Sequence, residues 1–427
     1  MITENIRKEI AALIRREVVP AIGCTEPVAV ALCTARATEL LGTTPDKITL
    51  RLSANMLKNA MGVGIPGTGG MIGLPIAIAL GALVGKSEYQ LEVLRDVTPQ
   101  AVQRGKAYID EKRIKVELHP DAPSKLYIDV AVSAGNDSAR AIIARAHTNL
   151  VYLEKNGNIE LDNPDRADKL EQSNDCHLSL ATVWEYATTS PIRELEYMKE
   201  ARRLNHEASQ AALKGNYGHS LGATINSCGE KYLGDSIIEH MLSRTSAACD
   251  ARMAGAPIPV MSNSGSGNQG ITATMPVVSF AEDIHASEEQ TLRALTLSHL
   301  TSIYIKQSLG RLSALCGCVV ASTGASVGLV YLMGGGYNEA CSAVKDMVAN
   351  LTGMICDGAK PSCSMKISSA VSTAMLSSML AMNGKCVTAA EGIVAEDVDQ
   401  TIHNLTSIGR EAMTETDRLV LKIMTSK

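Results

Sequence analysis

The chain has 427 residues and a net charge of −5 at pH 7, with no basic block or tail. Because surfaces that bind nucleic acids gather Lys and Arg, this charge distribution argues against a nucleic-acid partner. Hydrophobic residues make up 45% of the chain but aromatic residues only 3%, so small and flexible side chains must fill the core, which suits closely packed helices.

The N-terminus and the longest apolar runs give no membrane signal. The first twenty residues are charged and lack the apolar core of a signal peptide. The apolar run 71–85 is too short to span a bilayer and contains Pro75, while the run 312–336 is rich in Gly, Ala and Ser and predicts a buried helix. We therefore expect a cytoplasmic protein with no membrane partner.

The N-terminal part of the chain predicts two helices and then several strands. The helices are residues 4–18 and the segment GCTEPVAVALCTARATELL, where Pro27 occupies a favoured first-turn position. Patterns of strand length are found at 47–54, 114–119, 126–134, 139–146 and 150–157, with a helical stretch at 98–112. The turns HPDAPS and GNDS suit antiparallel hairpins, so we expect a small α+β domain at 45–164.

Beyond a polar connector at 161–175, strand patterns nearly vanish. Helical periodicity is found at about 180–213, 231–253, 286–310, 314–333, 338–354, 364–383 and 395–425. The predicted fold class is therefore α+β, with a predominantly helical domain formed by 1–44 and 165–427 and the smaller α+β domain with antiparallel strands at 45–164.

The segment CDGAKPSC places Cys356 and Cys363 seven residues apart on a short polar loop. This spacing does not suit a structural zinc site, but thiolates that hold an iron–sulfur cluster can be far apart in sequence. Cys316 and Cys318 offer further thiolates, yet on a regular helix they would point about 200° apart, so both can bind only if Gly317 breaks the turn. Spacing alone leaves a metal site and buried inert thiols equally open.

Two other segments carry candidate chemistry. In SNSGSGNQGITATMPV (262–277), Ser, Asn and Gly precede an apolar run, so backbone N–H groups can face a carboxylate or phosphate; the alternative is a plain interhelical loop. In GCTEP, Cys24 precedes a helix start, whose partial positive charge lowers a thiol pKa. Glu26 opposes that effect, and a structural cysteine is the alternative.

Together the segments GCTEPVAVAL, SANMLKNAMGVGIPGT, NSGSGNQGITATMPV, CGCVVASTG and MICDGAKPSC resemble the L-cysteine desulfidases. These are related to the alpha part of iron–sulfur-dependent L-serine dehydratases. The resemblance spans residues 20–383 and keeps the order of the motifs.

The resemblance implies a [4Fe–4S] cluster held by Cys316, Cys356 and Cys363, whose spacings of forty and seven positions match the family pattern. It also implies that Cys24 is the catalytic base. Three thiolates leave one iron open to bind the leaving group and the carboxylate, while the Cys24 thiolate removes the α-proton. Elimination then gives an aminoacrylate that hydrolyses to pyruvate and ammonia, with release of sulfide from L-cysteine or water from L-serine.

We expect the amino and carboxylate groups of the substrate to be bound by Asn55, Lys58, Asn59, Ser264, Gly265, Ser266, Gly267 and Asn268. Lys58 is the candidate partner of the carboxylate, and the alternative for this set is surface polar residues on loops. The expected partner is a small amino acid, and a homodimer remains open.

Two other functions compete with L-cysteine desulfidase. The first is an L-serine ammonia-lyase, although the softness of sulfur, which suits iron, favours cysteine slightly. The second is a non-enzymatic redox sensor that binds a cluster or zinc; a sensor has little need for GCTEP or the Gly-Ser loop.

Overall fold

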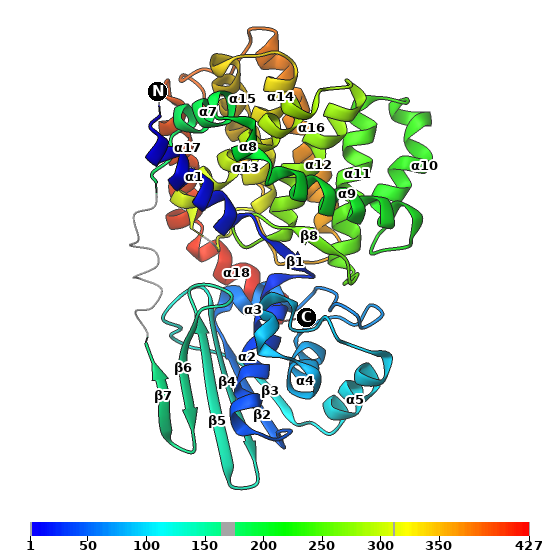
Figure 1. Ribbon diagram of the computed structural model, residues 1–427, viewed down its shortest axis with the longest axis vertical. Helices are drawn as coiled ribbons and strands as arrows, with labels where there is room; N and C mark the ends of the chain where they lie inside the picture. The colour runs from blue at the N-terminus through cyan, green and yellow to red at the C-terminus, as the bar shows by residue number, and fades with distance from the viewer. Residues whose placement is uncertain (1, 164–175, 311, 427) are drawn as a thin grey trace.

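The computed structural model describes residues 2–163, 176–310 and 312–426. Figure 1 shows a large helical body and, beside it, a smaller body in which helices pack on a sheet. The predicted α+β class is confirmed. In the described ranges, no helix is long and apolar enough to cross a membrane.

The smaller body is built on a six-stranded sheet. Its strand order is β3-β2-β4-β5-β6-β7. The strands are β2 (Lys47–Leu52), β3 (Ile114–Leu118), β4 (Tyr127–Ala134), β5 (Asp137–Ala144), β6 (Leu150–Lys155) and β7 (Asn158–Asp162). Strands β4 to β7 form the expected antiparallel hairpins, but β2 pairs with β3 in parallel, so the sheet is mixed. The parallel pair follows from the long helical connection between β2 and β3, which crosses over rather than turning back as a hairpin.

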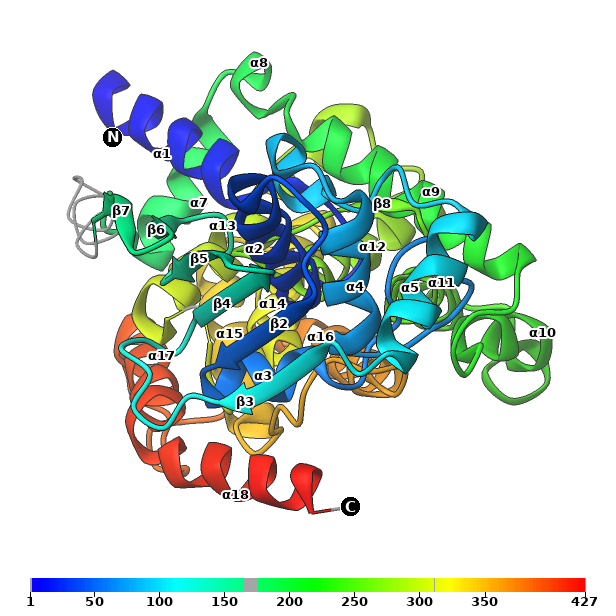
Figure 2. The same ribbon diagram turned by 90° about the horizontal axis from the view of Figure 1, so that it is seen from below.

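Helices cover one face of this sheet. Helices α2 (Thr25–Leu41) and α4 (Leu74–Val84) contact the strands, α5 (Pro99–Asp110) packs on α4, and α3 (Ala54–Ala60) contacts α2; a 3₁₀ turn η1 (Ser87–Glu92) follows α4. Figure 2 shows α2 and α4 on the same side of the strands. Ile128, Val130 and Val132 alternate along β4 and share one buried core with α2, as the two-residue period of a strand requires. Because α2 belongs to this core, the core reaches outside 45–164; the domain division stays a prediction.

The helical body contains most of the remaining chain. Its elements are α1 (Glu4–Glu17), α7 (Leu180–Thr189), α8 (Ile192–Leu195), α9 (Met198–Lys214), α10 (Leu221–Leu233), α11 (Ile237–Met253), α12 (Gly267–Asp283), α13 (Glu288–Leu309), α14 (Gly317–Leu332), α15 (Tyr337–Leu351), α16 (Cys363–Met382), α17 (Val398–Ser407), a π turn η2 (Ile408–Ala412) and α18 (Thr414–Thr425). Helix α14 is buried almost all round. A Cβ at Gly324 would lie 2.2 Å from the Ser298 carbonyl oxygen, so small residues allow α13 and α14 to approach closely.

Helical periodicity does not predict helix α12, which begins at Gly267 inside the Gly-Ser segment 262–277. The loop ends at Ser266, whose side chain caps the helix by accepting a hydrogen bond from the Gln269 N–H. Glycines at 267 and 270 hide the helix in the sequence because glycine has a low helix propensity. They are needed for packing, since a Cβ at Gly270 would lie 1.9 Å from the Met261 carbonyl oxygen.

A two-stranded antiparallel sheet joins distant parts of the chain. Strand β1 (Pro20–Ile22) pairs with β8 (Pro259–Met261). The pairing continues as the N–H of Ser264 donates to the carbonyl of Glu17 at 2.8 Å. This sheet, which lies at the boundary of the two bodies in Figure 1, brings the start of α2 beside the start of α12.

Candidate active site

A cavity of about 110 Å³ lies where α2 and α3 meet the helical body. That volume is well above the space one water molecule needs. The described residues that line the cavity are Cys24, Glu26, Asn59, Arg252, Ser266, Asn268, Gln269, Lys306, Leu312, Ser313, Leu315, Cys316, Gly317, Cys318, Cys356, Gly358, Ala359, Cys363, Lys366 and Ile367. The structure therefore brings together all four cysteines singled out in the sequence as base and cluster ligands.

A short backbone pairing holds Cys316 beside Cys356. Leu315 and Ile355 form an isolated antiparallel bridge. The Cys316 N–H donates to the Met354 carbonyl at 3.0 Å, and the Cys356 N–H donates to the Ala314 carbonyl at 2.6 Å. Interaction with the Cys316 thiol, together with burial, raises the pKa of the Cys356 thiol. This backbone pairing brings together two cysteines that are forty positions apart in the sequence.

The third thiol comes from the first residue of α16. Cys363 Sγ lies 3.7 Å from the carbonyl oxygen of Gly358 within the same loop. Gly358 has φ +91°, and a Cβ there would lie 2.4 Å from the carbonyl oxygen of Lys58. Only glycine fits such a close approach in the left-handed region. The loop can therefore pack directly on α3 and direct its thiols toward the cavity.

The structure brings Cys318 into the same group of thiols. Cys316 is the N-cap of α14 with an extended backbone (φ −67°, ψ 133°), so the helix begins at Gly317, as the break in the turn required. The Sγ atom of Cys318 lies 3.2 Å from that of Cys316 and 3.2 Å from Met354 Sδ. Because Cys316 precedes the first helical residue, the separation of about 200° expected on a regular helix does not apply, and both thiols line the same cavity.

The donor set fits a cluster better than a single ion. In the part of the chain that the structure describes, no group of three His, Cys, Asp or Glu side chains can hold one metal ion. A cluster binds each thiolate at a different iron, so its ligands need not meet at one point. The eleven cysteines are all free of disulfides, and burial raises the pKa of the Cys363 thiol. The lining also includes the cationic side chains of Arg252, Lys306 and Lys366, which suit thiolates.

Cys24 lies at the N-cap of α2 and contacts Glu26 directly. Its Sγ donates to Glu26 Oε2 at 3.0 Å. The Thr25 hydroxyl is 3.0 Å from that same oxygen and 2.9 Å from the Gly265 carbonyl. Asn59 Nδ2 donates to Glu26 Oε1 at 3.2 Å. The carboxylate of Glu26 is thus fixed beside the thiol by α2 and α3 together.

The expected lowering of the Cys24 pKa is not what the structure gives. Burial, followed by the charge of Glu26, raises the pKa of Cys24 well above its ordinary value, although Arg252 acts in the opposite direction. Burial also acts to raise the pKa of Glu26, but His147, the Cys24 hydrogen bond and Arg252 outweigh it, so that pKa is lowered. The helix start is therefore not enough to ionise this thiol, because desolvation is the larger effect.

The expected substrate residues separate into two groups. Asn59, Ser266 and Asn268 line the cavity, and the described lining residues do not include Asn55, Lys58, Ser264, Gly265 or Gly267. Ser264 and Gly265 form the turn before α12, with φ +48° and +79°. Asn55 and Lys58 instead bind Asp417 of α18, at 2.9 Å and 2.5 Å. Lys58 Nζ also donates to the Cys356 carbonyl at 3.2 Å, so it supports the cysteine loop from behind.

Sequence reasoning missed several lining residues, most notably Arg252 at the end of α11. Its Nη1 donates to Asn268 Oδ1 at 3.0 Å, and the residue is only 3% exposed. Gln269 was also missed; its Nε2 donates to the Asn263 carbonyl at 3.0 Å. Gln269 lies inside the Gly-Ser segment, which was a usable signal. Arg252 lies in an ordinary helical pattern that carried none.

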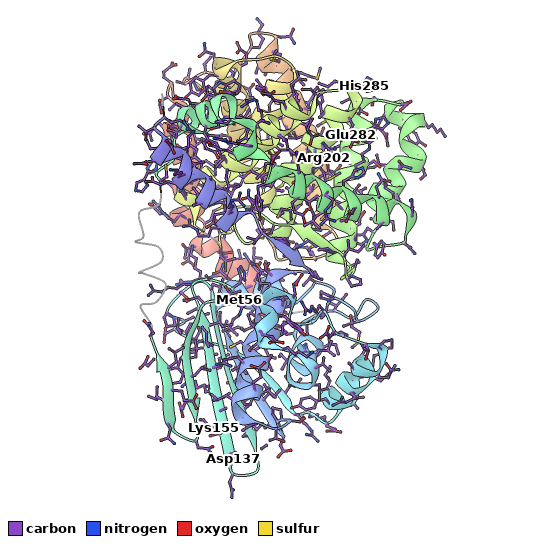
Figure 3. All side chains as sticks on the ribbon, in the orientation of Figure 1. Met56, Asp137, Lys155, Arg202, Glu282 and His285 are labelled. Atoms are coloured by element: carbon purple, nitrogen blue, oxygen red, sulfur yellow. The ribbon has the colours of Figure 1, made fainter. Side chains whose placement is uncertain are left out.

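A second cavity, of about 380 Å³, lies in the helical body away from the thiols. Among the described residues it is lined by Arg202, Val278, Ala281, Glu282, His285, Ala286, Glu288 and Thr291. Figure 3 shows Arg202, Glu282 and His285 near one another in this body, far from Asp137 and Lys155 at the outer end of the sheet. Arg202 pairs with Glu288 at 2.7 Å across it.

Comparison with known proteins agrees with the motifs. A family model described as serine dehydratase alpha chain matches residues 88–422. A protein of Bacteroides thetaiotaomicron named UPF0597 protein is 61% identical over 99% of both chains, and one of Oleidesulfovibrio alaskensis with that name is 47% identical over 97% of both. The chain belongs to the serine dehydratase alpha chain family.

Proposed function

We propose that this protein is an L-cysteine desulfidase, a carbon–sulfur lyase that converts L-cysteine to pyruvate, ammonia and hydrogen sulfide with a [4Fe–4S] cluster. One observation carries the proposal: Cys24, which precedes Cys316 by 292 positions, lines the same cavity as Cys316, Cys356 and Cys363. Buried inert thiols have no physical reason to gather around one cavity beside a carboxylate.

Cys316, Cys356 and Cys363 are the proposed ligands of the cluster. When bound, the cluster would supply a Lewis-acidic iron without a protein ligand to bind the leaving group. Lys58 and Lys366 support the ligand loop, since Lys58 donates to the Cys356 carbonyl and Lys366 to the Ile355 carbonyl at 2.9 Å.

Cys24 is the proposed base, with Glu26 as the group that takes its thiol proton. The hydrogen bond from Sγ to Glu26 Oε2 gives that proton a direct route to the carboxylate. The resulting thiolate removes the α-proton, the electron pair forms the Cα–Cβ double bond, and the Cβ–S bond breaks. Burial excludes water, so the thiolate meets the substrate unsolvated.

Polar groups at the start of α12 and in α3 are proposed to orient the amino acid. Ser266, Asn268 and Asn59 line the cavity beside Cys24 and present hydroxyl and amide groups. Such groups fix the orientation of a small ligand when they converge on one site.

L-serine is the second candidate substrate, favoured by the description of the matching family model. L-serine and L-cysteine differ only in the leaving heteroatom, so the same residues can serve an L-serine ammonia-lyase. The soft sulfur of cysteine suits iron better, which is why we place L-cysteine first.

The test is anaerobic reconstitution with iron and sulfide, followed by steady-state assays of pyruvate on L-cysteine and L-serine. We expect the larger kcat/KM on L-cysteine, with sulfide and pyruvate formed in equal amounts. A larger kcat/KM on L-serine would reassign the substrate. A protein that gains visible absorbance but makes no pyruvate from either amino acid would instead be a cluster-binding sensor.

A further inference from the structure

We propose that Arg252 binds the α-carboxylate of the amino-acid substrate and so selects α-amino acids over their carboxylate-free analogues. This inference rests on the proposed lyase function and goes beyond it by naming the residue that recognises the substrate class.

Arg252 is a buried cation without an acidic partner at ion-pair distance among the described residues. Arg252 is only 3% exposed, and it lines the same cavity as Cys24 and the proposed cluster ligands. Its one hydrogen bond given by the structure goes from Nη1 to Asn268 Oδ1, a neutral acceptor, and its buried Nε has no partner. A buried charge left this way is costly, so a ligand that pairs with it would be held strongly.

Two other cations near the cysteine loop already have acidic partners. Lys58 is paired with Asp417, and Lys366 is paired with Asp357. Glu26 is the carboxylate whose charge reaches Arg252, but its oxygens accept from Cys24, Thr25 and Asn59. The carboxylate role that the sequence suggested for Lys58 thus passes to Arg252.

The chemistry of the side chain specifies the ligand. A guanidinium group presents a planar fork of N–H donors that matches the two oxygens of a carboxylate. Arg252 acts electrostatically on both Cys24 and Glu26, so it lies in the part of the cavity where the α-proton must be removed. A carboxylate held there is attached to the carbon that loses this proton.

Gly267 allows the guanidinium to occupy its position. A Cβ at residue 267 would lie 2.2 Å from Arg252 Nε, so the side chain rests directly against the glycine. This contact supplies a variant that keeps the arginine but displaces it, namely Gly267→Ala.

The competing interpretation is structural: Arg252 only ties α11 to α12 through Asn268. A titration separates the two interpretations. Full-length Cys24→Ala protein with a reconstituted cluster, which cannot turn over, is titrated with L-serine and with L-serinamide. Serinamide keeps the amino and hydroxyl groups but replaces the carboxylate by a neutral amide.

We expect Arg252→Gln to weaken L-serine binding roughly 10- to 100-fold, the size expected for charged hydrogen bonds, while L-serinamide binding changes less than about twofold. Arg252→Lys should fall between the two because it keeps the charge and loses the fork. Arg244→Gln on the same helix, whose side chain pairs with Glu282 at 2.7 Å, is the matched control.

Equal weakening of both ligands, or no change in either, would overturn the proposal. If Arg252→Gln fails to fold, Gly267→Ala gives the same comparison, with Gly353→Ala as its control because nothing lies within 4 Å of a Cβ there. A folded Gly267→Ala protein that still prefers L-serine as the parent does would also overturn it. If the parent makes pyruvate while these variants bind normally, only the Arg252 assignment fails; if the parent makes none, the proposed function fails.

Discussion

The two cavities described above differ in how their polar groups are satisfied. The larger one, about 380 Å³, is lined in part by Arg202 and Glu288, which pair with each other. Both of those side chains are about half exposed, at 42% and 50%. The smaller one, about 110 Å³, is lined by five cysteines and by the buried Arg252, which has no acidic partner within ion-pair distance among the described residues.

This difference shows why volume is a poor guide to function here. Charged pairs that remain in water stabilise the fold by little and leave no unmet interaction for a ligand. A buried guanidinium costs free energy unless something pairs with it. The smaller cavity therefore has the chemistry of a ligand site, and the following experiments test how far the two differ.

The largest effect should come from the proposed cluster ligands. Replacing Cys316, Cys356 or Cys363 with Ser removes one of three thiolates, so we expect loss of visible absorbance and of pyruvate formation together. Iron content and the anaerobic visible spectrum check this. Cys318→Ser is the matched control and should keep most of both, although its Sγ lies 3.2 Å from that of Cys316. Loss of the cluster in Cys318→Ser would add it to the ligand set.

Cys24→Ala should lower turnover about 10³-fold while keeping the visible spectrum, because general-base catalysis contributes roughly 10²- to 10⁴-fold. Exchange of the substrate α-hydrogen with deuterated water, followed by NMR, should stop as well. Cys228→Ser removes an exposed thiol outside the cavity and should leave both rates unchanged. Pyruvate formation near the parent rate in Cys24→Ala would assign the base to another group.

Asp417→Asn should lower the free energy of unfolding by about 3 kcal/mol or more, because it leaves the buried Lys58 ammonium without its counter-charge. The pair is well suited to this test, since the Lys58 side chain is 2% exposed and that of Asp417 is 13% exposed. Urea unfolding measures the change. Glu415→Gln on the same helix breaks only the exposed pair with Arg418 and should change stability by less than about 0.5 kcal/mol.

His299 should make the protein sensitive to acid. Burial lowers the pKa of His299 to about 3, whereas an unfolded histidine gains a proton near pH 6.5. Below about pH 6.5 the unfolded state takes up a proton that the folded state does not, so the free energy of unfolding falls as the pH falls toward about 3. The loss is about 2 kcal/mol at about pH 5, and there is none well above about pH 6.5. The difference in unfolding free energy between pH 7 and pH 5 should therefore be smaller in His299→Gln than in the parent. An unchanged difference would contradict the burial argument.

The smallest effect should come from the larger cavity. Arg202→Gln removes an exposed ion pair, so we expect a change in stability within about 0.5 kcal/mol and no change in kcat or KM. A marked loss of turnover in this variant would show that the larger cavity also contributes to the reaction.

The sequence predicted the fold class because local patterns carry it. Alternation along 126–134 identified strand β4, and helical periodicity identified α13 and α15 within a few residues. It missed α12, because glycines at 267 and 270 lower helix propensity while serving a packing contact. It also missed the parallel pairing of β2 with β3, because a strand pattern does not record which neighbour it pairs with.

What the sequence determined by itself about the site was the set of thiols, since Cys24, Cys316, Cys356 and Cys363 stand in recognisable short motifs. Only the tertiary structure decided that they line one cavity, because the β1–β8 pairing and the bridge between Leu315 and Ile355 bring together segments that are far apart in the sequence. The tertiary structure also placed Lys58 with Asp417 and left Arg252 without an acidic partner at ion-pair distance among the described residues. Charge pairing depends on which side chains meet in space, and burial decides what an unmet charge costs.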